Sequence, residues 1–202
     1  MSNSGLIMRT SSGTSIVSPE TKLFSDERKI YISGEINDQM MVDFNQKIQV
    51  LLKEDSASPI TLIIDSEGGE IKSGLAMYYM IIGIQTKVEV YIYCLSKAYS
   101  MAAILFSSGK KGNRFLLPCS EVMIHEPALS TRNGINGSMS TIKSITDSME
   151  RYKTTLDEIL AKHTGKTIEE IAQATSFNNY MTATEACEFG IADKVVGFEE
   201  MI

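Results

Sequence analysis

The sequence predicts an α/β domain built on a largely parallel sheet, and three observations support this prediction. Short runs rich in β-branched residues alternate with amphipathic segments of about a dozen residues, which is typical of βα units joined by right-handed crossovers. The length of 202 residues suits one domain rather than two. A hydrophobic fraction of 43% is enough for a core of ordinary size.

Three βα units follow an N-terminal arm. Residues 1–27 are rich in Ser, Thr and Gly with little periodicity, so we expect this arm to be mobile or irregular. Each unit begins with a short apolar run typical of a strand and continues with a segment of helical periodicity. In the first unit a strand over 29–33 precedes a helix that begins at Asn37 or Asp38. In the second, a strand over 60–64 precedes a helix over 71–84. In the third, a strand over 88–95 precedes a helix over 100–106.

After the third unit the pattern changes, and two short strands are expected over 114–117 and 121–124. A long helix over 138–162 then carries a single apolar stripe. Such a stripe can pack against a neighbouring subunit or cover the sheet of its own subunit, and the residues alone leave both alternatives open. Shorter helices are expected over 167–174 and 182–189, the second of them opened by a capping box.

Charge and composition exclude several classes of function. The net charge is −6 and the basic residues are scattered, which argues against a nucleic-acid-binding surface; the short cluster Lys110, Lys111 and Arg114 is interpreted as a solvated edge. No apolar run approaches the roughly 18 residues of a membrane span. Three widely spaced cysteines without a CxxC motif and only two histidines favour neither a disulfide framework nor a metal site. We therefore expect a soluble, cytoplasmic protein without metal, nucleic acid or membrane partners.

Ser100 is the first candidate for chemistry, because it stands where an expected strand gives way to a helix rich in small residues. Backbone N–H groups at a helix N-terminus can cap the helix or stabilise a developing oxyanion. A lone serine there is more often an N-cap. His125, at the end of an apolar strand, is the partner that would make Ser100 a nucleophile. The chain order and the missing G-x-S-x-G motif exclude the α/β-hydrolase and chymotrypsin arrangements.

A second candidate is the glycine pair Gly68-Gly69 at another strand-to-helix junction. Glycines let a backbone N–H face a substrate carbonyl, although they suit a tight turn equally well. The spacing fits neither GxGxxG nor the P-loop, and the flanking Glu67 and Glu70 would repel a phosphate. An oxyanion or peptide-backbone role is therefore favoured over nucleotide binding.

Several motifs together give a family resemblance. They are 97–103 around Ser100, 114–118 with 123–127 around His125, 66–69, 163–165 and 180–193. In order and spacing, from about residue 20 to 198, they resemble ClpP, the proteolytic subunit of the ATP-dependent Clp protease. The resemblance implies an α/β fold of ClpP/crotonase-like repeated ββα units, with a mostly parallel sheet and a long protruding helix, the handle, used in oligomerisation. It also implies one peptidase domain over 28–198 behind an N-terminal arm or axial loop over 1–27.

The same resemblance implies a serine endopeptidase with Ser100 as nucleophile and His125 as general base. The backbone N–H groups of Gly69 and Met101 would then form the oxyanion hole. The further substrate-binding residues would be Gly68, Glu70, Pro127 and Ala128. Family members stack two heptameric rings through the handle, here about 126–162, and receive unfolded polypeptide from an AAA+ Clp ATPase. The expected assembly is therefore one or two rings of seven copies, and the chain itself needs no cofactor, because the ATP is used by the partner.

The sequence departs from the family at the third triad position, where Asn178 replaces an aspartate. An amide can orient the His125 ring but does not neutralise the imidazolium that forms during attack. We therefore expect weak activity of the chain alone. The alternative is a largely inactive structural or regulatory ring subunit of a mixed Clp complex.

Further departures affect assembly and docking. Ser176 and Phe177 stand where an acidic and a basic residue usually pair between rings, and Thr61 and Ile63 stand where aromatic residues usually meet the ATPase. These differences favour a specialised paralogue, which could share rings with a second ClpP-type subunit. A crotonase-type acyl-CoA enzyme is a remoter alternative that the Ser–His pair disfavours.

Overall fold

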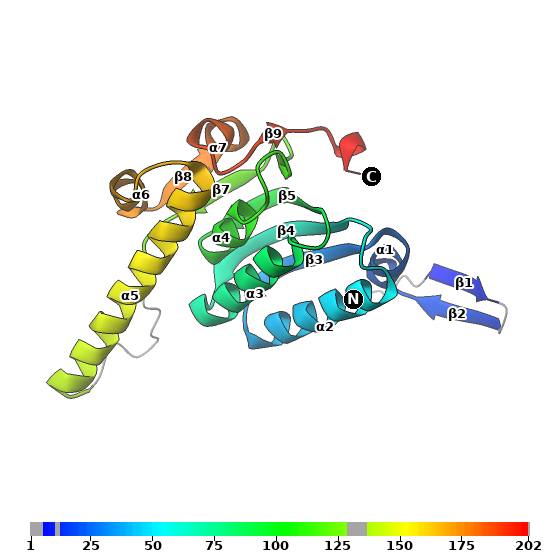
Figure 1. Cartoon of the computed structure of the whole chain (residues 1–202), viewed down its shortest axis with the longest axis horizontal. Coiled ribbons are helices and arrows are strands. Elements are labelled where there is room, and N and C mark those ends of the chain that lie inside the picture. The colour runs from blue at the N-terminus through cyan, green and yellow to red at the C-terminus, as the bar shows by residue number, and fades with distance from the viewer. Residues whose placement is uncertain (1–5, 11–12, 129–136, 202) are drawn as a thin grey trace.

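A seven-stranded, mostly parallel sheet forms the centre of the computed structural model, which describes residues 6–10, 13–128 and 137–201 (Figure 1). Adjacent strands along the main path pair in parallel. That path is β3 (Lys29–Ile36), β4 (Ile60–Gly69), β5 (Val90–Tyr99), β6 (Arg114–Leu116) and β9 (Lys194–Val195). Off this path, β7 (Glu121–Ile124) pairs in parallel with β5, and β8 (Asn179–Thr182) pairs antiparallel with β7. The predicted α/β class is confirmed.

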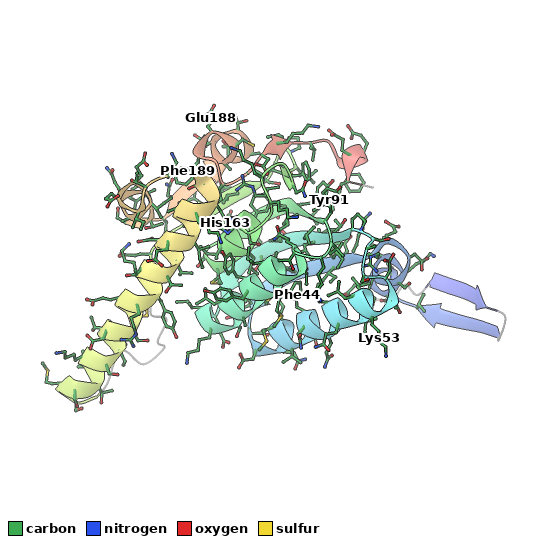
Figure 2. All side chains as sticks on the ribbon, in the orientation of Figure 1. Phe44, Lys53, Tyr91, His163, Glu188 and Phe189 are labelled. Atoms are coloured by element: carbon green, nitrogen blue, oxygen red, sulfur yellow. The ribbon has the colours of Figure 1, made fainter. Side chains whose placement is uncertain are left out.

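Three helices cover one face of this sheet: α2 (Asp38–Glu54), α3 (Ile71–Ile84) and α4 (Met101–Ser107) (Figure 1). The Asn37 side chain caps α2 by accepting a hydrogen bond from the backbone N–H of Met40. Phe44 of α2 (Figure 2), Met77 of α3 and most of α4 join one buried cluster with the inner strands. Because β4 is a central strand, its apolar residues are buried on both faces, as parallel sheets require.

The N-terminal arm differs from the irregular segment that its composition predicted. β1 (Leu6–Thr10) and β2 (Gly13–Val17) pair antiparallel as a hairpin that extends away from the sheet, and α1 (Pro19–Glu27) follows (Figure 1). The Ser18 side chain caps α1 by accepting from the N–H of Thr21, and Pro19 occupies the first turn. Strands of five residues are too short for their periodicity to stand out in a segment of mostly polar residues.

The long helix α5 (Met139–Thr164) begins at the Ser138 cap and ends at Gly165 in the left-handed conformation. Its C-terminal half packs on the domain through the apolar residues Leu156, Ile159 and Leu160, all buried. Its N-terminal half projects from the body (Figure 1), and Met139 there is 83% exposed. The C-terminal half therefore packs on its own subunit, whereas packing of the projecting half against a neighbouring subunit stays a prediction. Residues 129–136 of the predicted handle region, including the positions Leu129 and Ser130, lie outside the described residues.

Of the remaining helices, α7 (Ala183–Phe189) opens with the predicted capping box, and α6 (Ile168–Thr175) opens with one that was not predicted. The boxes are Thr182–Glu185 and Thr167–Glu170, and a short 3₁₀ helix (Phe198–Glu200) ends the described chain. In both boxes the Thr hydroxyl accepts a hydrogen bond from the backbone N–H of the Glu, and the Glu carboxylate accepts one from the backbone N–H of the Thr. Among the described residues, no helix combines the length and apolar character needed to cross a membrane.

Arg114 corrects the interpretation of the basic cluster as a solvated edge. Its side chain is only 2% exposed and makes a two-pronged contact with Asp193, with Nη2–Oδ1 at 2.6 Å and Nε–Oδ2 at 2.8 Å. A third donor, Nη1, binds the backbone oxygen of His163 at 3.0 Å. Arg114 thus joins β6, the C-terminal segment and the end of α5. The neighbouring Lys110 and Lys111 are exposed, as predicted.

His163, labelled in Figure 2, connects the C-terminal end of α5 to α3 by a side-chain hydrogen bond. Its Nε2 lies 2.9 Å from the hydroxyl of Tyr78. Burial, and to a lesser degree the nearby charges of Lys162 and Arg114, lower the pKa of His163 to about 4. The ring is therefore neutral at pH 7 and acts as a packing and hydrogen-bonding group.

Candidate active site

Ser100 occupies a strained turn between β5 and α4. Its φ is 54° and its ψ is −121°, a conformation that a residue with a Cβ rarely adopts. Within the described part of the chain, Ser100 and Arg28 are the non-glycine residues with positive φ. Two backbone hydrogen bonds hold the turn: the Ser100 N–H donates to the oxygen of Met123 at 2.8 Å, and the Ser100 oxygen accepts from Ala103 at 3.0 Å. Strain that surrounding contacts maintain is typical of functional positions.

Parallel strand pairing brings His125 to Ser100. β5 and β7 run side by side with Tyr99 opposite Met123, so both strands end at the same edge of the sheet. Ser100 and His125 follow these ends, and the His125 Nε2 lies 2.8 Å from the Ser100 Oγ. The structure therefore brings together the predicted Ser–His pair, which is separated by 25 residues along the chain.

The glycine pair is explained by the close approach of β4 to the Ser100 turn. A Cβ added to Gly68, which has φ +96°, would lie 2.7 Å from the Tyr99 oxygen and 2.8 Å from the Ser100 Cβ. A Cβ at Gly69 would lie 2.1 Å from the backbone oxygen of Ile36 on β3. Neither position has room for a side chain, so the glycines allow the end of β4 to pack directly against the nucleophile turn.

A cavity of about 80 Å³ opens beside the pair and is lined by Ser100 and His125. Of the other predicted site residues, Gly69, Met101, Pro127 and Ala128 also line it. Gly68 packs behind the Ser100 turn instead. Glu70 is exposed at the start of α3, where its Oε2 lies 2.9 Å from the hydroxyl of Ser73. In the part of the chain that the structure describes, no group of His, Cys, Asp or Glu side chains is arranged to hold a metal ion.

Asn178 lies next to the site without joining it. The last pair of the β7–β8 ladder is Ile124 with Asn179, so the following positions, His125 and Asn178, face one another at the end of the ladder. The Asn178 side chain is exposed. Among the hydrogen bonds of the described residues, none joins it to the His125 ring. The structure thus brings Ser100 and His125 into contact but not the third predicted member, whose role stays a prediction.

Sequence reasoning missed one charged residue in the cavity wall, Asp157 of α5, which is 5% exposed. Thr175 at the end of α6 lines the cavity beside it. A signal was present, because Asp157 stands between Leu156 and the pair Ile159-Leu160 on the buried side of α5. A charge inside an apolar stripe indicates either a buried pair or a site.

Comparisons with known proteins identify the family of the chain. The model of the family described as Clp protease matches residues 12–199. The ATP-dependent Clp protease proteolytic subunit 1 of Thermobifida fusca (strain YX) is 35% identical over 194 residues, which cover 96% of this chain and 85% of that protein. These matches confirm the resemblance inferred from the motifs around Ser100 and His125. The chain belongs to the Clp protease family.

Proposed function

We propose that the chain is a serine endopeptidase subunit of a Clp protease that cuts unfolded polypeptides into short peptides. The observation that carries this proposal is the distance of 2.8 Å between the His125 Nε2 and the Ser100 Oγ. At this distance a neutral imidazole accepts the hydroxyl proton while the Oγ attacks a substrate carbonyl. His125 then returns the proton to the leaving amine, and water releases the acyl group by the same route in reverse.

Backbone N–H groups beside Ser100 supply the oxyanion hole in this mechanism. Met101 is the first residue of α4, so its N–H has no acceptor within the helix. Gly69, the last residue of β4, lines the same cavity as Met101. Two such donors would stabilise the negative oxygen of the tetrahedral intermediate. Because main-chain groups rather than side chains dominate this contact, we expect substrates to bind as extended strands.

Assembly into rings is supported by apolar residues that remain exposed in the single chain. Met139 and Ile142, one turn apart on the projecting half of α5, are 83% and 36% exposed, and Phe177 beside the site is 60% exposed. Neighbouring exposed apolar groups on one helix face are typical of protein contacts. We infer rings of seven, single or stacked in pairs, of this chain alone or mixed with a second ClpP-type subunit, and Phe177 would give an apolar ring contact in place of a charge pair.

Docking of an AAA+ Clp ATPase is supported by aromatic residues on the sheet face opposite the helices. Tyr91 and Tyr93 of β5 alternate with the buried Ile92, and the Tyr93 ring stacks on Phe115 of β6 with centroids 4.8 Å apart. These neighbours offset the absence of aromatics at Thr61 and Ile63. Figure 2 labels Tyr91 on this side of the sheet. The ATPase would deliver unfolded polypeptide, and the energy of ATP would be used there.

Labelling with a fluorophosphonate probe tests the proposal, because the probe reacts only with an activated serine. We expect the wild-type protein to be labelled and Ser100→Ala to be unlabelled. The matched control is Ser25→Ala, an exposed serine on α1, which should label normally. Labelling that survives Ser100→Ala would contradict the proposal by assigning the reactive serine elsewhere. A wild-type protein that neither labels nor cuts an unfolded polypeptide would contradict it and favour the inactive ring subunit.

Asn178→Asp is expected to raise peptide turnover by roughly one to two orders of magnitude. A carboxylate opposite His125 would stabilise the imidazolium that forms during attack, which the amide does not do. The gain should stay below the roughly 10⁴-fold loss caused by the reverse change in a trypsin-type triad, since the loop has adapted to the amide. The measurement is kcat for a fluorogenic peptide with the assembled protein.

Asn179→Asp is the matched control for this change, because Asn179 pairs with Ile124 one position further along β8. It should leave turnover unchanged. Adding Ser100→Ala to Asn178→Asp must remove the gain. Unchanged or lower turnover of Asn178→Asp in an intact assembly would mean that Asn178 does not serve His125.

A further inference from the structure

A buried carboxylate lies on the wall of the cavity beside Ser100, and the proposed mechanism gives it no task. Asp157 is 5% exposed and lines the same cavity as Ser100 and His125. Apart from these two and Thr175, the wall consists mainly of apolar side chains and backbone. A charge in such surroundings costs free energy unless it is paired.

Asp157 shares its cationic partner, Lys153, with a second carboxylate. Its Oδ2 lies 2.8 Å from the Lys153 ammonium, and its Oδ1 accepts a hydrogen bond from the Thr175 hydroxyl at 3.2 Å. Lys153 also lies 4.0 Å from the Glu126 carboxylate, next to His125. Two carboxylates and one ammonium, those of Glu126, Asp157 and Lys153, leave a formal charge of −1 in this group, and Asp157 brings it to the cavity wall. One additional cation would neutralise them.

The cavity suits a slender side chain with a charged tip. Its volume of about 80 Å³ is roughly half that of the 150 Å³ cavity that accepts a benzene ring, so an aromatic side chain fits poorly. Ile71, Leu156 and Leu160 offer apolar wall to an aliphatic stem. Lys and Arg side chains combine such a stem with a cationic head. A Leu side chain would instead remove water from the carboxylate without replacing it.

We propose that Asp157 is a specificity-determining residue that selects Lys or Arg at the substrate position immediately before the cleaved bond. This inference rests on the proposed peptidase function, because the cavity receives that side chain only when the carbonyl lies against Ser100. The cationic head shares the Asp157 carboxylate with Lys153, and Lys153 moves toward Glu126. Thr175, whose hydroxyl lies 3.2 Å from the Asp157 Oδ1, lines the same cavity beside it.

Binding of cleavage products tests the proposal without requiring turnover. The assembled Ser100→Ala protein is mixed with acetylated peptides that differ only in their C-terminal residue, Lys, Arg, Leu or Phe, and affinity is measured by competition with a fluorescent peptide. We expect Lys and Arg to bind about tenfold more tightly than Leu, as a close charge pair provides. Asp157→Asn in the same background should remove this difference. Glu158→Gln, the same charge change on the exposed side of α5, should preserve it.

Cleavage of matched peptides by the Ser100 protein gives the second measurement, the ratio of kcat/KM for Lys and Leu substrates. Asp157→Asn should shift this ratio toward Leu, whereas a purely structural role would lower both values equally. If Asp157→Asn does not fold, Lys153→Gln tests the same proposal. It should raise the preference for Lys, because the Asp157 carboxylate then has no competing ammonium and is free to pair with the substrate.

The two proposals fail in different ways. If Ser100 is not labelled and no peptide is cleaved, the proposed peptidase function is refuted. The binding measurements with product peptides still show whether the cavity prefers a basic side chain. Labelling and cleavage without a basic preference, or a preference that neither Asp157→Asn nor Lys153→Gln alters, overturns the role of Asp157 and leaves the peptidase intact.

Discussion

Gly68→Ala is expected to slow the labelling of Ser100 and the hydrolysis of peptides by about a hundredfold or more. The new Cβ would lie 2.7 Å from the Tyr99 oxygen and 2.8 Å from the Ser100 Cβ, both part of the nucleophile turn. Because these are backbone and Cβ atoms, no flexible side chain can move aside. The turn must shift, and a displacement of about 1 Å costs roughly 10²-fold in rate.

Gly112→Ala separates this clash from the cost of an unfavourable φ. Gly112 has φ +98°, close to the +96° of Gly68, but a Cβ there meets nothing within 4 Å. Both variants therefore carry a similar conformational penalty of about 1–2 kcal/mol. Labelling rates with the fluorophosphonate probe should fall in Gly68→Ala and stay near wild type in Gly112→Ala. Equal rates in the two variants would show that β4 does not position the nucleophile.

Arg114→Met is expected to destabilise the protein by about 3–5 kcal/mol, the largest effect on stability that we predict. The change leaves the Asp193 carboxylate, 12% exposed, without its cation and removes the donor to the His163 oxygen. Removing one partner of a buried pair costs more than removing both. The denaturation midpoint at fixed protein concentration measures the effect, since assembly makes stability depend on concentration.

Two variants control for this change. The double variant Arg114→Met with Asp193→Asn removes both charges. The amide oxygen of the new Asn can still accept the backbone N–H of residue 114. This variant should therefore regain much of the stability that Arg114→Met loses. Lys22→Met breaks the exposed pair with Asp26 and should change stability by less than about 1 kcal/mol. A single Arg114→Met variant as stable as Lys22→Met would show that the pair does not hold the C-terminal segment.

The same pair predicts a dependence on pH. Burial by itself would raise the pKa of Asp193, but the hydrogen bonds and charge of Arg114, with backbone N–H groups, hold this pKa below its usual value. A lowered pKa in the folded state stabilises the protein above the ordinary pKa of an aspartate, and this contribution is lost as the pH falls through the folded-state pKa. The difference in stability between the wild type and Arg114→Met should therefore narrow on acidification.

Local signals in the sequence were sufficient for the helices that follow the N-terminal arm, whereas α1 within the arm was not predicted. The expected helix over 71–84 coincides with α3, and the capping residues Ser138, Thr167 and Thr182 begin α5, α6 and α7. These features depend on contacts three or four residues apart, which the sequence displays directly. The motifs around Ser100 and His125 likewise sufficed to identify the family.

Strand ends and buried charges depended on partners far along the chain. The strands β4 and β5 continue to Gly69 and Tyr99, beyond the expected ends at residues 64 and 95, because β3 pairs with the end of β4 and β7 pairs with the end of β5. The glycine pair predicts a loop when it is considered locally. Only the pairing with Ile36 extends β4 to the edge where Ser100 lies.

By itself, the sequence determined the α/β class, the helices that follow the N-terminal arm and the family, and it predicted that Ser100 and His125 would meet. The tertiary structure decided that Arg114 is buried against Asp193, 79 residues away, and that Asp157 lines the Ser100 cavity. It also left the Asn178 side chain exposed, and none of the hydrogen bonds among the described residues joins Asn178 to His125. The physical reason is range: caps and periodicity arise within one helical turn, whereas the environment of a charge is set by every element that packs around it.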